Sequence, residues 1–276
     1  MKIAIQGARG SFHDIVARDW FGPDIELVEC EWFDDVFAVL QSHAADRAVC
    51  AVENSLYGSI NDVYDLLIKH RVAIVGEVPS HIHQQLIGLA DAHVSGVTCI
   101  YSHPVALNQC REFLDAHLPE AQRIEHHDTA DAVRLVAERG DPTNMAIASH
   151  LAAELHGLKI HRQNIEDEAL NYTRFLILDP NASPVVDANK ASLVLQTDHS
   201  PGSLYRALGV FAQIGLNMTK LYSRPIRGKL WRYQFFVDLE TDEPHLKKAI
   251  HLLEEDNCEV TLLGHYKAHA SENILS

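Results

Sequence analysis

The sequence has few cysteines and few basic residues. The five cysteines are odd in number, widely spaced and without a C-x-x-C pair, which argues against a disulfide framework and against a structural zinc site. Lysine and arginine number 23 against 38 acidic residues, so the formal net charge is −15. Such a charge repels nucleic acid and anionic membranes. Any anionic ligand must therefore be bound by local positive groups.

The sequence also has no apolar run that approaches the about 18 residues needed to span a bilayer. Its first residues run from Met1 into a glycine-containing turn, without a basic segment, a long apolar stretch and a cleavage site. We therefore expect a soluble, cytoplasmic protein with reduced cysteines, and neither a nucleic-acid nor a membrane partner.

The length and the pattern of the first 180 residues predict an α/β domain within a two-domain chain. The 276 residues exceed an average domain, and the apolar share of 47% is that of a globular protein. Short β-rich runs followed by turns and helices recur, as in α/β sheets. The expected strands are 2–6, 47–52, 97–101 and 145–148, and a helix is expected at 129–139. Extended stretches at 72–89 and 171–178 suggest two lobes with crossing strands.

Residues 191–268 follow a polar linker and predict a different fold. The expected strands are 192–197, 216–223, 230–239 and 259–266, and the expected helices are 202–214 and 243–255. This order is βαββαβ, the ferredoxin-like arrangement. From Trp231 onward, apolar residues alternate with polar ones, so one sheet face meets the helices. The other face is expected to be wetter and to serve as a pairing surface, because so small a core gains burial by dimerising.

The first strand is followed by the glycine-containing turn Gly7-Ala8-Arg9-Gly10. The spacing does not fit the dinucleotide fingerprint G-x-G-x-x-G, because Ser11-Phe12 is too bulky at the third glycine position. What remains is a turn of backbone N–H groups with Ser11 as helix N-cap, where a carboxylate could sit. A plain structural turn is the alternative.

Two further strand ends carry polar residues. Glu53-Asn54-Ser55 precedes a helix start, where backbone donors favour an anion, although an Asx or Ser turn would explain the same residues. Ser102-His103-Pro104 precedes a helix in which Pro104 suits the first turn and Gln109 lies about one turn further on. Simple helix capping is again the alternative.

An arginine and two histidine pairs are candidates for ligand contacts. Arg174 lies inside an apolar strand-like run, where its planar fork would match a carboxylate, unless it reaches solvent from an edge strand. Among the 18 histidines, the pairs His81/His83 and His126/His127 suggest a metal site. No third ligand of matching spacing is visible, so we expect no bound metal.

Taken together, these motifs resemble those of a known family. GARGSF (7–12), VENSLYGSI (52–60), SHPVALNQC (102–110) and NYTRF (171–175) are similar, in order and spacing, to the successive motifs of prephenate dehydratase. DHSPGSLYRAL (198–208) and LNMTKLYSRP (216–225) are similar to the ACT regulatory domain of the same enzymes. The resemblance implies a catalytic domain at 1–180, with two lobes as in periplasmic-binding-protein folds, and an ACT domain at 190–268.

The resemblance also implies an activity. Members of this family convert prephenate to phenylpyruvate, carbon dioxide and water in L-phenylalanine biosynthesis, without a cofactor, and phenylalanine inhibits them through the ACT domain. Dimers or tetramers are expected. Because Met1 begins the first predicted strand, we expect no chorismate mutase activity. A preference for arogenate, the amino analogue of prephenate, stays open.

The family pattern assigns roles to particular residues. It implies catalytic roles for Thr173, Ser102, Gln109 and Asn54, and substrate contacts for Arg174, Ser55, Ser11 and Phe175. It implies effector contacts for Pro201, Gly202, Ser203, Leu204, Asn217 and Met218. Ser203 and Tyr222 depart from the usual alanine and glutamate, so the effector's identity is left open. As a hypothesis, Thr173 donates a hydrogen bond or relays a proton, since its hydroxyl is a poor acid by itself.

Two other functional classes compete with this interpretation. A two-lobed ligand-binding fold with an ACT domain would also serve as a small-molecule sensor without catalysis, although Thr173 with Asn54 and Gln109 favours chemistry. A nicotinamide dehydrogenase with a regulatory tail is disfavoured by the broken glycine pattern.

Overall fold

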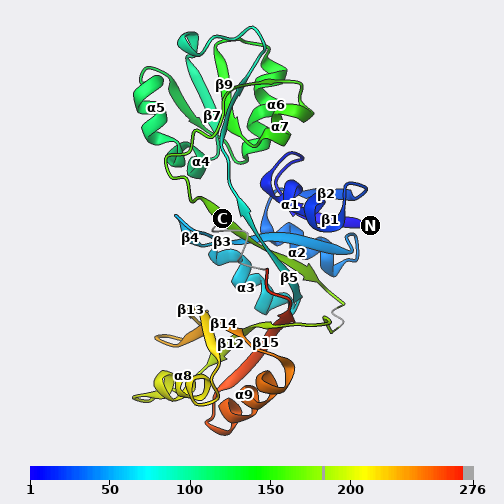
Figure 1. Ribbon diagram of the computed structural model, residues 1–276, viewed down its shortest axis with the longest axis vertical. Coiled ribbons are helices and arrows are strands. Elements are labelled where there is room, and N and C mark those ends of the chain that lie inside the picture. Colours follow the sequence, from blue (N-terminus) through cyan, green and yellow to red (C-terminus); the bar gives the residue numbers. More distant parts are fainter. Residues whose placement is uncertain (182–183, 270–276) are drawn as a thin grey trace. The chain divides into compact units, whose positions relative to one another are not determined.

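The computed structural model describes residues 1–181 and 184–269 (Figure 1). By their contacts these residues form two compact units. Unit 1 comprises Met1–Leu66 and Val78–Phe175, and unit 2 comprises Leu67–Glu77 and the residues from Leu176 onward. The division of the chain into functional domains at 1–180 and 190–268 stays a prediction.

The first sheet has the strand order β2-β1-β3-β11-β5, with β4 paired to β3. Its strands are β1 (Lys2–Gln6), β2 (Glu26–Cys30), β3 (Arg47–Asn54), β4 (Gly58–Ser59), β5 (Ala73–His81) and β11 (Tyr172–Asp179). The associated helices are α1 (Phe12–Phe21), α2 (Phe33–Gln41) and α3 (Asn61–His70). Strand β1 has the predicted bounds and pairs in parallel with β2 and β3, as a strand–helix–strand repeat requires.

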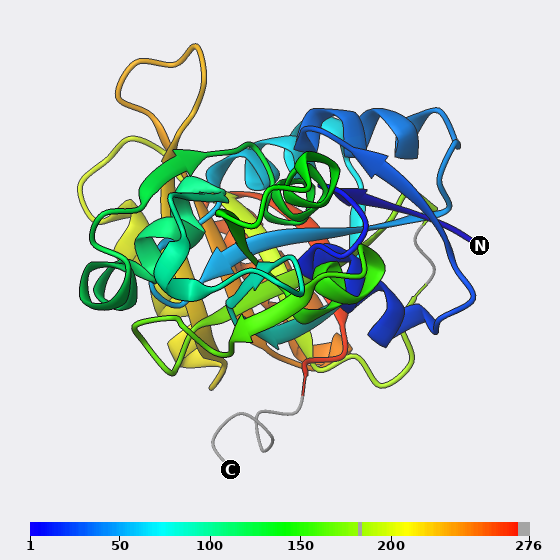
Figure 2. The ribbon, with the colours of Figure 1, turned by 90° about the horizontal axis from the view of Figure 1, so that it is seen from above.

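The second sheet has the order β10-β6-β9-β7-β8 and is covered on both faces (Figures 1 and 2). Its strands are β6 (Gln85–Gly88), β7 (Cys99–Ser102), β8 (Gln122–Glu125), β9 (Asn144–Ala148) and β10 (Lys159–Arg162). Successive strand residues point to opposite faces, so Leu86 packs with helices α4 (Pro104–Gln109) and α5 (Arg111–His117). Ile87 packs with α6 (Thr129–Arg139) and α7 (His150–Leu155). The helix expected to begin at Pro104 ends at Gln109, and α5 begins at Arg111 after Cys110.

The part of unit 1 built on the first sheet is the first lobe, and the part built on the second sheet is the second lobe. Two crossing segments, residues 82–84 and residues 163–171, join them. They run beside each other, because Ile82 N donates to Asn171 O at 2.8 Å and Ile165 N donates to Gln84 O at 2.9 Å. The predicted two-lobed arrangement with crossing extended segments is confirmed.

The predicted βαββαβ order is also confirmed. Its elements are β12 (Lys190–Gln196), α8 (Ser203–Gln213), β13 (Asn217–Pro225), β14 (Tyr233–Glu240), α9 (Glu243–Glu255) and β15 (Glu259–Tyr266). The antiparallel sheet has the order β13-β14-β12-β15. Leu193 and Leu239 on one face pack with Phe211 of α8 and Leu253 of α9. This face forms the core of the C-terminal fold.

The other face of this sheet does not match the expectation of a wet surface. Val194, Phe236 and Tyr266 are at most 2% exposed. A Cβ added at Gly264 of β15 would collide with the Ile74 carbonyl oxygen, so the segment Leu67–Glu77 of unit 2 covers this face at close range. The expectation of a wetter face was wrong because strand alternation shows which residues share a face but not what that face packs against; pairing of two copies through this sheet stays a prediction.

Strand β14 begins at Tyr233 rather than at 230, and Trp231 is 76% exposed with φ 57°, so the predicted alternation does not hold at Trp231.

In the described part of the chain, no helix is long and apolar enough to cross a membrane.

Candidate active site

A cavity of about 570 Å³ lies in unit 1 and is lined by residues of both lobes. From the first lobe it receives side chains at the ends of β1, β3 and β11, and from the second lobe it receives side chains of α4 and of the segment before α6. Its polar lining includes Ser11, His13, Asn54, Gln84, His103, Gln109, Asp128 and Thr173. Five of the eight predicted catalytic and substrate-binding residues line it, namely Ser11, Asn54, Gln109, Thr173 and Phe175.

Thr173 is held by Asn54 across the pairing of β11 with β3. The Asn54 amide nitrogen Nδ2 donates to Thr173 Oγ1 at 3.0 Å and to Asn171 Oδ1 at 2.8 Å. Its carbonyl oxygen accepts from Leu56 N and Tyr57 N, which fixes the amide orientation in an Asx turn. Because Thr173 Oγ1 accepts the Asn54 hydrogen, its own hydroxyl hydrogen is directed to another acceptor. The site therefore offers a positioned hydroxyl donor at the cavity wall.

Four buried amides form a connected group behind Thr173, which we name the amide cluster: Asn54, Gln84, Gln109 and Asn171. Gln84 Nε2 donates to Gln109 Oε1 at 3.0 Å, and Gln109 Nε2 donates to Asn171 Oδ1 at 3.4 Å. Gln84 is 2% exposed and Asn171 is 0% exposed. In the described part of the chain, Gln84 Oε1 and Asn171 Nδ2 are the two buried side-chain atoms without a hydrogen-bond partner. Such open groups are costly unless a ligand or water completes them.

In the turn after β1, the backbone N–H groups of Arg9 and Gly10 donate to carboxylates of the protein itself. Ser11 caps α1 as predicted, accepting from Asp14 N at 3.4 Å. The carboxylate expected to sit on this turn is a protein side chain, since Gly10 N donates to Asp14 Oδ2 at 2.9 Å and Arg9 N donates to Glu29 Oε2 at 3.1 Å. A substrate contact for Ser11 therefore depends on its position in the cavity wall and stays a prediction.

Gly10 itself fits its position for a steric reason. Its φ is 85°, and a Cβ there would lie 2.7 Å from the Ala152 backbone of α7. The Ser149 hydroxyl, at the N-terminus of the same helix, donates to Gly10 O at 2.5 Å. The turn after β1 thus contacts the second lobe directly, which a side chain at this position would prevent.

Two serines with predicted roles are bonded to the backbone. Ser55 Oγ donates to Leu170 O at 2.8 Å, and Ser55 lies in the Asx turn before β4 rather than at a helix start. Ser102 is fully buried and its Oγ donates to Ile147 O at 2.6 Å. The helix after Ser102 is capped by His103, whose Nδ1 accepts from Val105 N. Neither serine is among the residues that line the cavity, and their roles in the reaction stay predictions.

Arg174 lies beside Thr173 in sequence but is not among the residues that line the cavity. Consecutive strand residues point to opposite faces, and Thr173 and Phe175 are the β11 residues that line it. Arg174 Nη1 is 4.0 Å from Glu53 Oε2. A carboxylate clamp at Arg174 therefore stays a prediction.

Burial shifts the ionisation of three groups in the cavity wall. Burial lowers the pKa of His13 to about 3, and its Nε2 accepts from Ala51 N at 3.1 Å as a neutral ring. Burial also lowers the pKa of His103. Burial raises the pKa of Asp128, although hydrogen bonds from backbone N–H groups, including that of Ala8, oppose the shift. The cavity therefore favours neutral forms over charged ones.

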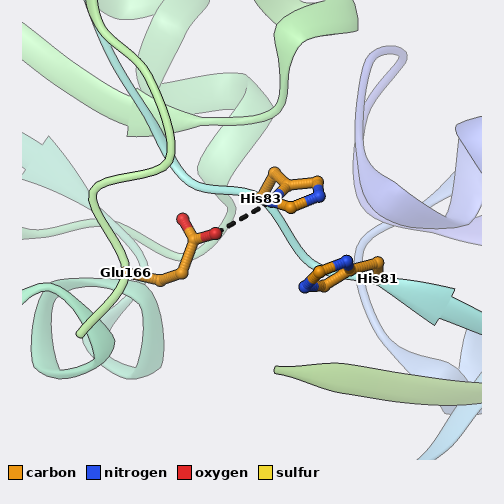
Figure 3. Close-up of side chains that lie close together, drawn as sticks. All are labelled: His81, His83 and Glu166. Atoms are coloured by element: carbon orange, nitrogen blue, oxygen red, sulfur yellow. Dashed lines mark hydrogen bonds and ion pairs between the residues drawn. The ribbon is translucent and has the colours of Figure 1, made fainter. Parts of the chain in front are cut away.

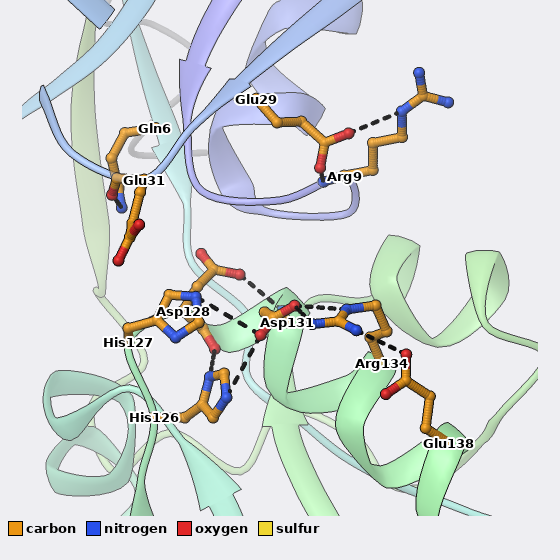
Figure 4. Close-up of polar contacts among 10 residues, drawn as sticks. All are labelled: Gln6, Arg9, Glu29, Glu31, His126, His127, Asp128, Asp131, Arg134 and Glu138. Carbon is orange, nitrogen blue, oxygen red and sulfur yellow. Dashed lines mark hydrogen bonds and ion pairs between the residues drawn. The ribbon is translucent and has the colours of Figure 1, made fainter. Parts of the chain in front are cut away.

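Each histidine pair has a nearby carboxylate that the sequence did not indicate. His81 and His83 lie close to Glu166 of the crossing segment 163–171 (Figure 3). His126 and His127 lie close to Asp131 of α6 (Figure 4). Sequence spacing did not indicate these carboxylates, because the third residue comes from another element or from the next turn of helix; the absence of a bound metal stays a prediction.

The predicted effector residues lie in unit 2. Pro201 and Gly202 precede α8, where Gly202 has φ 81°, followed by Ser203 and Leu204 in its first turn. Ser203 Oγ donates to Thr197 Oγ1 at 3.2 Å. Asn217 Nδ2 donates to Glu240 Oε2 at 2.7 Å, with Met218 next to it on β13. Binding of an effector at these six residues stays a prediction.

The chain is similar to other proteins along nearly its whole length. The family model described as prephenate dehydratase matches residues 3–183. The chain is 36% identical to the bifunctional chorismate mutase/prephenate dehydratase of Aquifex aeolicus, over 96% of this chain and 73% of that protein. It is 35% identical to arogenate dehydratase/prephenate dehydratase 1 of Arabidopsis thaliana, over 96% of this chain and 72% of that protein.

Two solved structures are similar to the fold. GqqA, described as a novel type of quorum quenching acylase, has a TM-score of 0.88 and 33% identity, over 98% of both chains. The prephenate dehydratase from Arthrobacter aurescens, in complex with L-Phe, has a TM-score of 0.88 and 24% identity, over 97% of this chain and 90% of that chain. From the match to the family model and the identity to the curated relatives, the chain belongs to the prephenate dehydratase family.

Proposed function

We propose that this chain catalyses the decarboxylating dehydration of prephenate to phenylpyruvate in L-phenylalanine biosynthesis. The family match supports the reaction class. The observation that carries the proposal is the Thr173 hydroxyl, which lines the cavity and accepts from Asn54 at 3.0 Å, so that its hydrogen is available to a ligand.

The chemistry needs little more than positioning. Prephenate carries a ring carboxylate and a ring hydroxyl para to it, and it loses both as the ring becomes aromatic. The enzyme must direct a proton to the departing hydroxyl and keep the carboxylate aligned while it fragments. Thr173 would donate to the leaving oxygen, or relay a proton to it, without ionising. Gln84, which lines the cavity, would complete the hydrogen bonds of its Oε1 with a polar group of the bound substrate.

The assay that tests the proposal follows phenylpyruvate by its absorbance in alkali after incubation with prephenate at neutral pH. We expect product to form well above the spontaneous rate without an added cofactor. Product formation at the spontaneous rate would contradict the proposal. Arogenate run in parallel, with phenylalanine measured as product, decides the substrate preference, since the Arabidopsis relative is named for both activities.

We propose in addition that L-phenylalanine regulates the enzyme through the C-terminal ACT-like fold. The Arthrobacter enzyme was solved with L-Phe bound, and the motifs at 198–208 and 216–225 of this chain resemble those of the ACT domain. Isothermal calorimetry on the full chain should give binding heat, and light scattering should give a dimer or tetramer. No heat and a monomer at micromolar concentration would contradict this regulation. A cytoplasmic location stays a prediction from the sequence.

A second candidate activity is amide hydrolysis. GqqA, described as a quorum quenching acylase, is 33% identical to this chain over 98% of both chains. Apolar residues of the cavity wall, among them Phe12, Phe33 and Val105, would accommodate an acyl chain. Incubation with an N-acyl amide and detection of the free amine distinguishes the two reactions, because dehydration of prephenate releases no amine.

A further inference from the structure

The cluster of His81, His83 and Glu166 lies where the chain passes between the two lobes (Figure 3). Strand β5 ends at His81, and His83 follows in the crossing segment 82–84. Glu166 belongs to the other crossing segment, 163–171, and is 83 residues from His83 in sequence. One potential ligand atom from each of the three side chains lies within 4.8 Å of the others.

The hydrogen bond of His81 leaves one of its ring nitrogens available. His81 Nε2 is 2.7 Å from Ala169 O, and because a carbonyl only accepts, this nitrogen carries the proton. The neutral ring then has its lone pair on Nδ1, and a hydrogen bond of this kind fixes the tautomer and the ring orientation of a metal-binding histidine. His83 Nδ1 is 2.8 Å from Glu166 Oε1, so these two atoms bind the same ion when the ion replaces the proton between them.

Glu166 supplies a buried negative charge with spare acceptor capacity. Its side chain is 4% exposed. Its Oε2 accepts from Gln84 N at 2.8 Å and its Oε1 faces His83. Among residues 1–181 and 184–269, no lysine or arginine forms an ion pair with it. Its partner His83 compensates this charge only as an imidazolium. Beside a neutral ring the buried carboxylate is expensive, and a bound divalent ion would compensate its charge.

In the second histidine cluster, formed by His126, His127 and Asp131, the carboxylate is already paired with an arginine (Figure 4). Asp131 Oδ2 is 3.4 Å from His126 Nε2 and 3.6 Å from His127 Nε2. Its other oxygen, however, is 2.6 Å from Arg134 Nε and 2.5 Å from Arg134 Nη2. The guanidinium already neutralises the carboxylate, and it would repel a second cation. The two clusters therefore differ in charge balance although both have two histidines and one carboxylate.

From this we propose that His81, His83 and Glu166 bind a divalent transition-metal ion such as Zn²⁺. Two imidazoles and one carboxylate form a known ligand set for zinc, with bonds of about 2.0–2.2 Å and a remaining position for water. The ion takes its ligands from both crossing segments, so it ties them together at the point where the lobes are joined. This proposal is independent of the reaction assigned to the cavity.

The test is a Zn²⁺ titration of the untagged, EDTA-treated full chain by isothermal calorimetry at neutral pH. We expect one ion per chain, and a rise in Tm that saturates with Zn²⁺, because a ligand that binds the folded state stabilises it. The double variant His81→Ala/His83→Ala should bind at least tenfold more weakly. Co²⁺ should give visible absorption bands in the wild type that are lost in the double variant.

Matched controls separate this site from binding by other histidines. His126→Ala and His127→Ala should leave the affinity and the Tm shift unchanged. Glu166→Gln, which keeps an acceptor for Gln84 N, should weaken binding while its circular dichroism stays that of the wild type and its Tm in EDTA does not fall, because the amide carries no charge to bury. Equal affinity of the wild type and the double variant, or loss of the site in His126→Ala, would overturn the proposal.

Discussion

Two buried polar clusters, one in each unit, differ in how completely their hydrogen bonds are made. In unit 2, Ser192 Oγ donates to Asp238 Oδ1 at 2.6 Å and lies 2.8 Å from Tyr266 Oη. None of these three side chains has a buried nitrogen or oxygen atom without a hydrogen-bond partner. In unit 1, the amide cluster leaves Gln84 Oε1 and Asn171 Nδ2 open. A closed cluster stabilises the fold, whereas an open one costs stability and provides groups that a ligand can use.

The largest expected effect is that of Thr173→Ala. This change removes the hydroxyl that Asn54 positions at the cavity wall, and kcat for prephenate should fall roughly 10²-fold or more, the scale of one lost proton-transfer or oxyanion-type contact. Thr173→Ser, which keeps the hydroxyl, should retain most of the activity. Near-normal turnover of Thr173→Ala would show that the Thr173 hydroxyl takes no part in the reaction.

The buried His13 of unit 1, whose Nε2 accepts a hydrogen bond from Ala51 N, should make the stability of the protein depend on pH. Its pKa is lowered to about 3 by burial, below the unfolded value of about 6.5. The neutral ring therefore contributes stability that is fully present above pH 6.5 and is lost as pH falls toward 3, by up to about 1.4 kcal/mol per pH unit. Urea unfolding at pH 7.5 and pH 5 measures the loss. His13→Gln should show a smaller loss, and equal slopes for both proteins would contradict the assignment.

Gln84→Met tests the open acceptor directly. The substitution keeps the length of the side chain and removes the unpartnered Oε1 together with the Nε2 donor to Gln109, so KM for prephenate should rise about tenfold, which is about 1.4 kcal/mol. The neighbouring Gln85 is a matched control, because its amide bonds Asn164 in both directions. Gln85→Met should lower Tm without changing KM. A tenfold rise in KM for both variants would remove the distinction between open and closed amides.

The sequence predicted local structure well, because local structure depends on neighbouring residues. Helix α6 was placed at its observed bounds of Thr129 to Arg139, since Gly140 adopts the left-handed conformation that ends it. Strand β1 and the βαββαβ order were also predicted. A helix cap, a turn or a periodic pattern depends on residues only a few positions apart, so each can be recognised in the sequence.

Features that depend on distant partners could not be predicted in this way. Gln84 gave no signal, because its role in the cavity depends on Gln109 and on the return of the chain at Asn171. The Glu166 partner of His83 comes from 83 residues away. Ser102 was assigned to catalysis by its motif, and only its hydrogen bond to Ile147 O indicates that it stabilises a strand.

The smallest expected effect is that of two serine variants, one in each unit. Ser102→Ala removes a bond to Ile147 O, and Ser192→Ala removes a donor to Asp238. Each should lower the free energy of unfolding by about 1 kcal/mol, the net value of one buried hydrogen bond, and Ser192→Ala should leave kcat and KM unchanged. Ser192→Ala should cost the more of the two, because it leaves a buried carboxylate one donor short. Denaturant unfolding and the phenylpyruvate assay on the same preparations measure both. A fall in kcat for Ser102→Ala comparable to that of Thr173→Ala would support the catalytic role that the resemblance implies, and an unchanged kcat would contradict it.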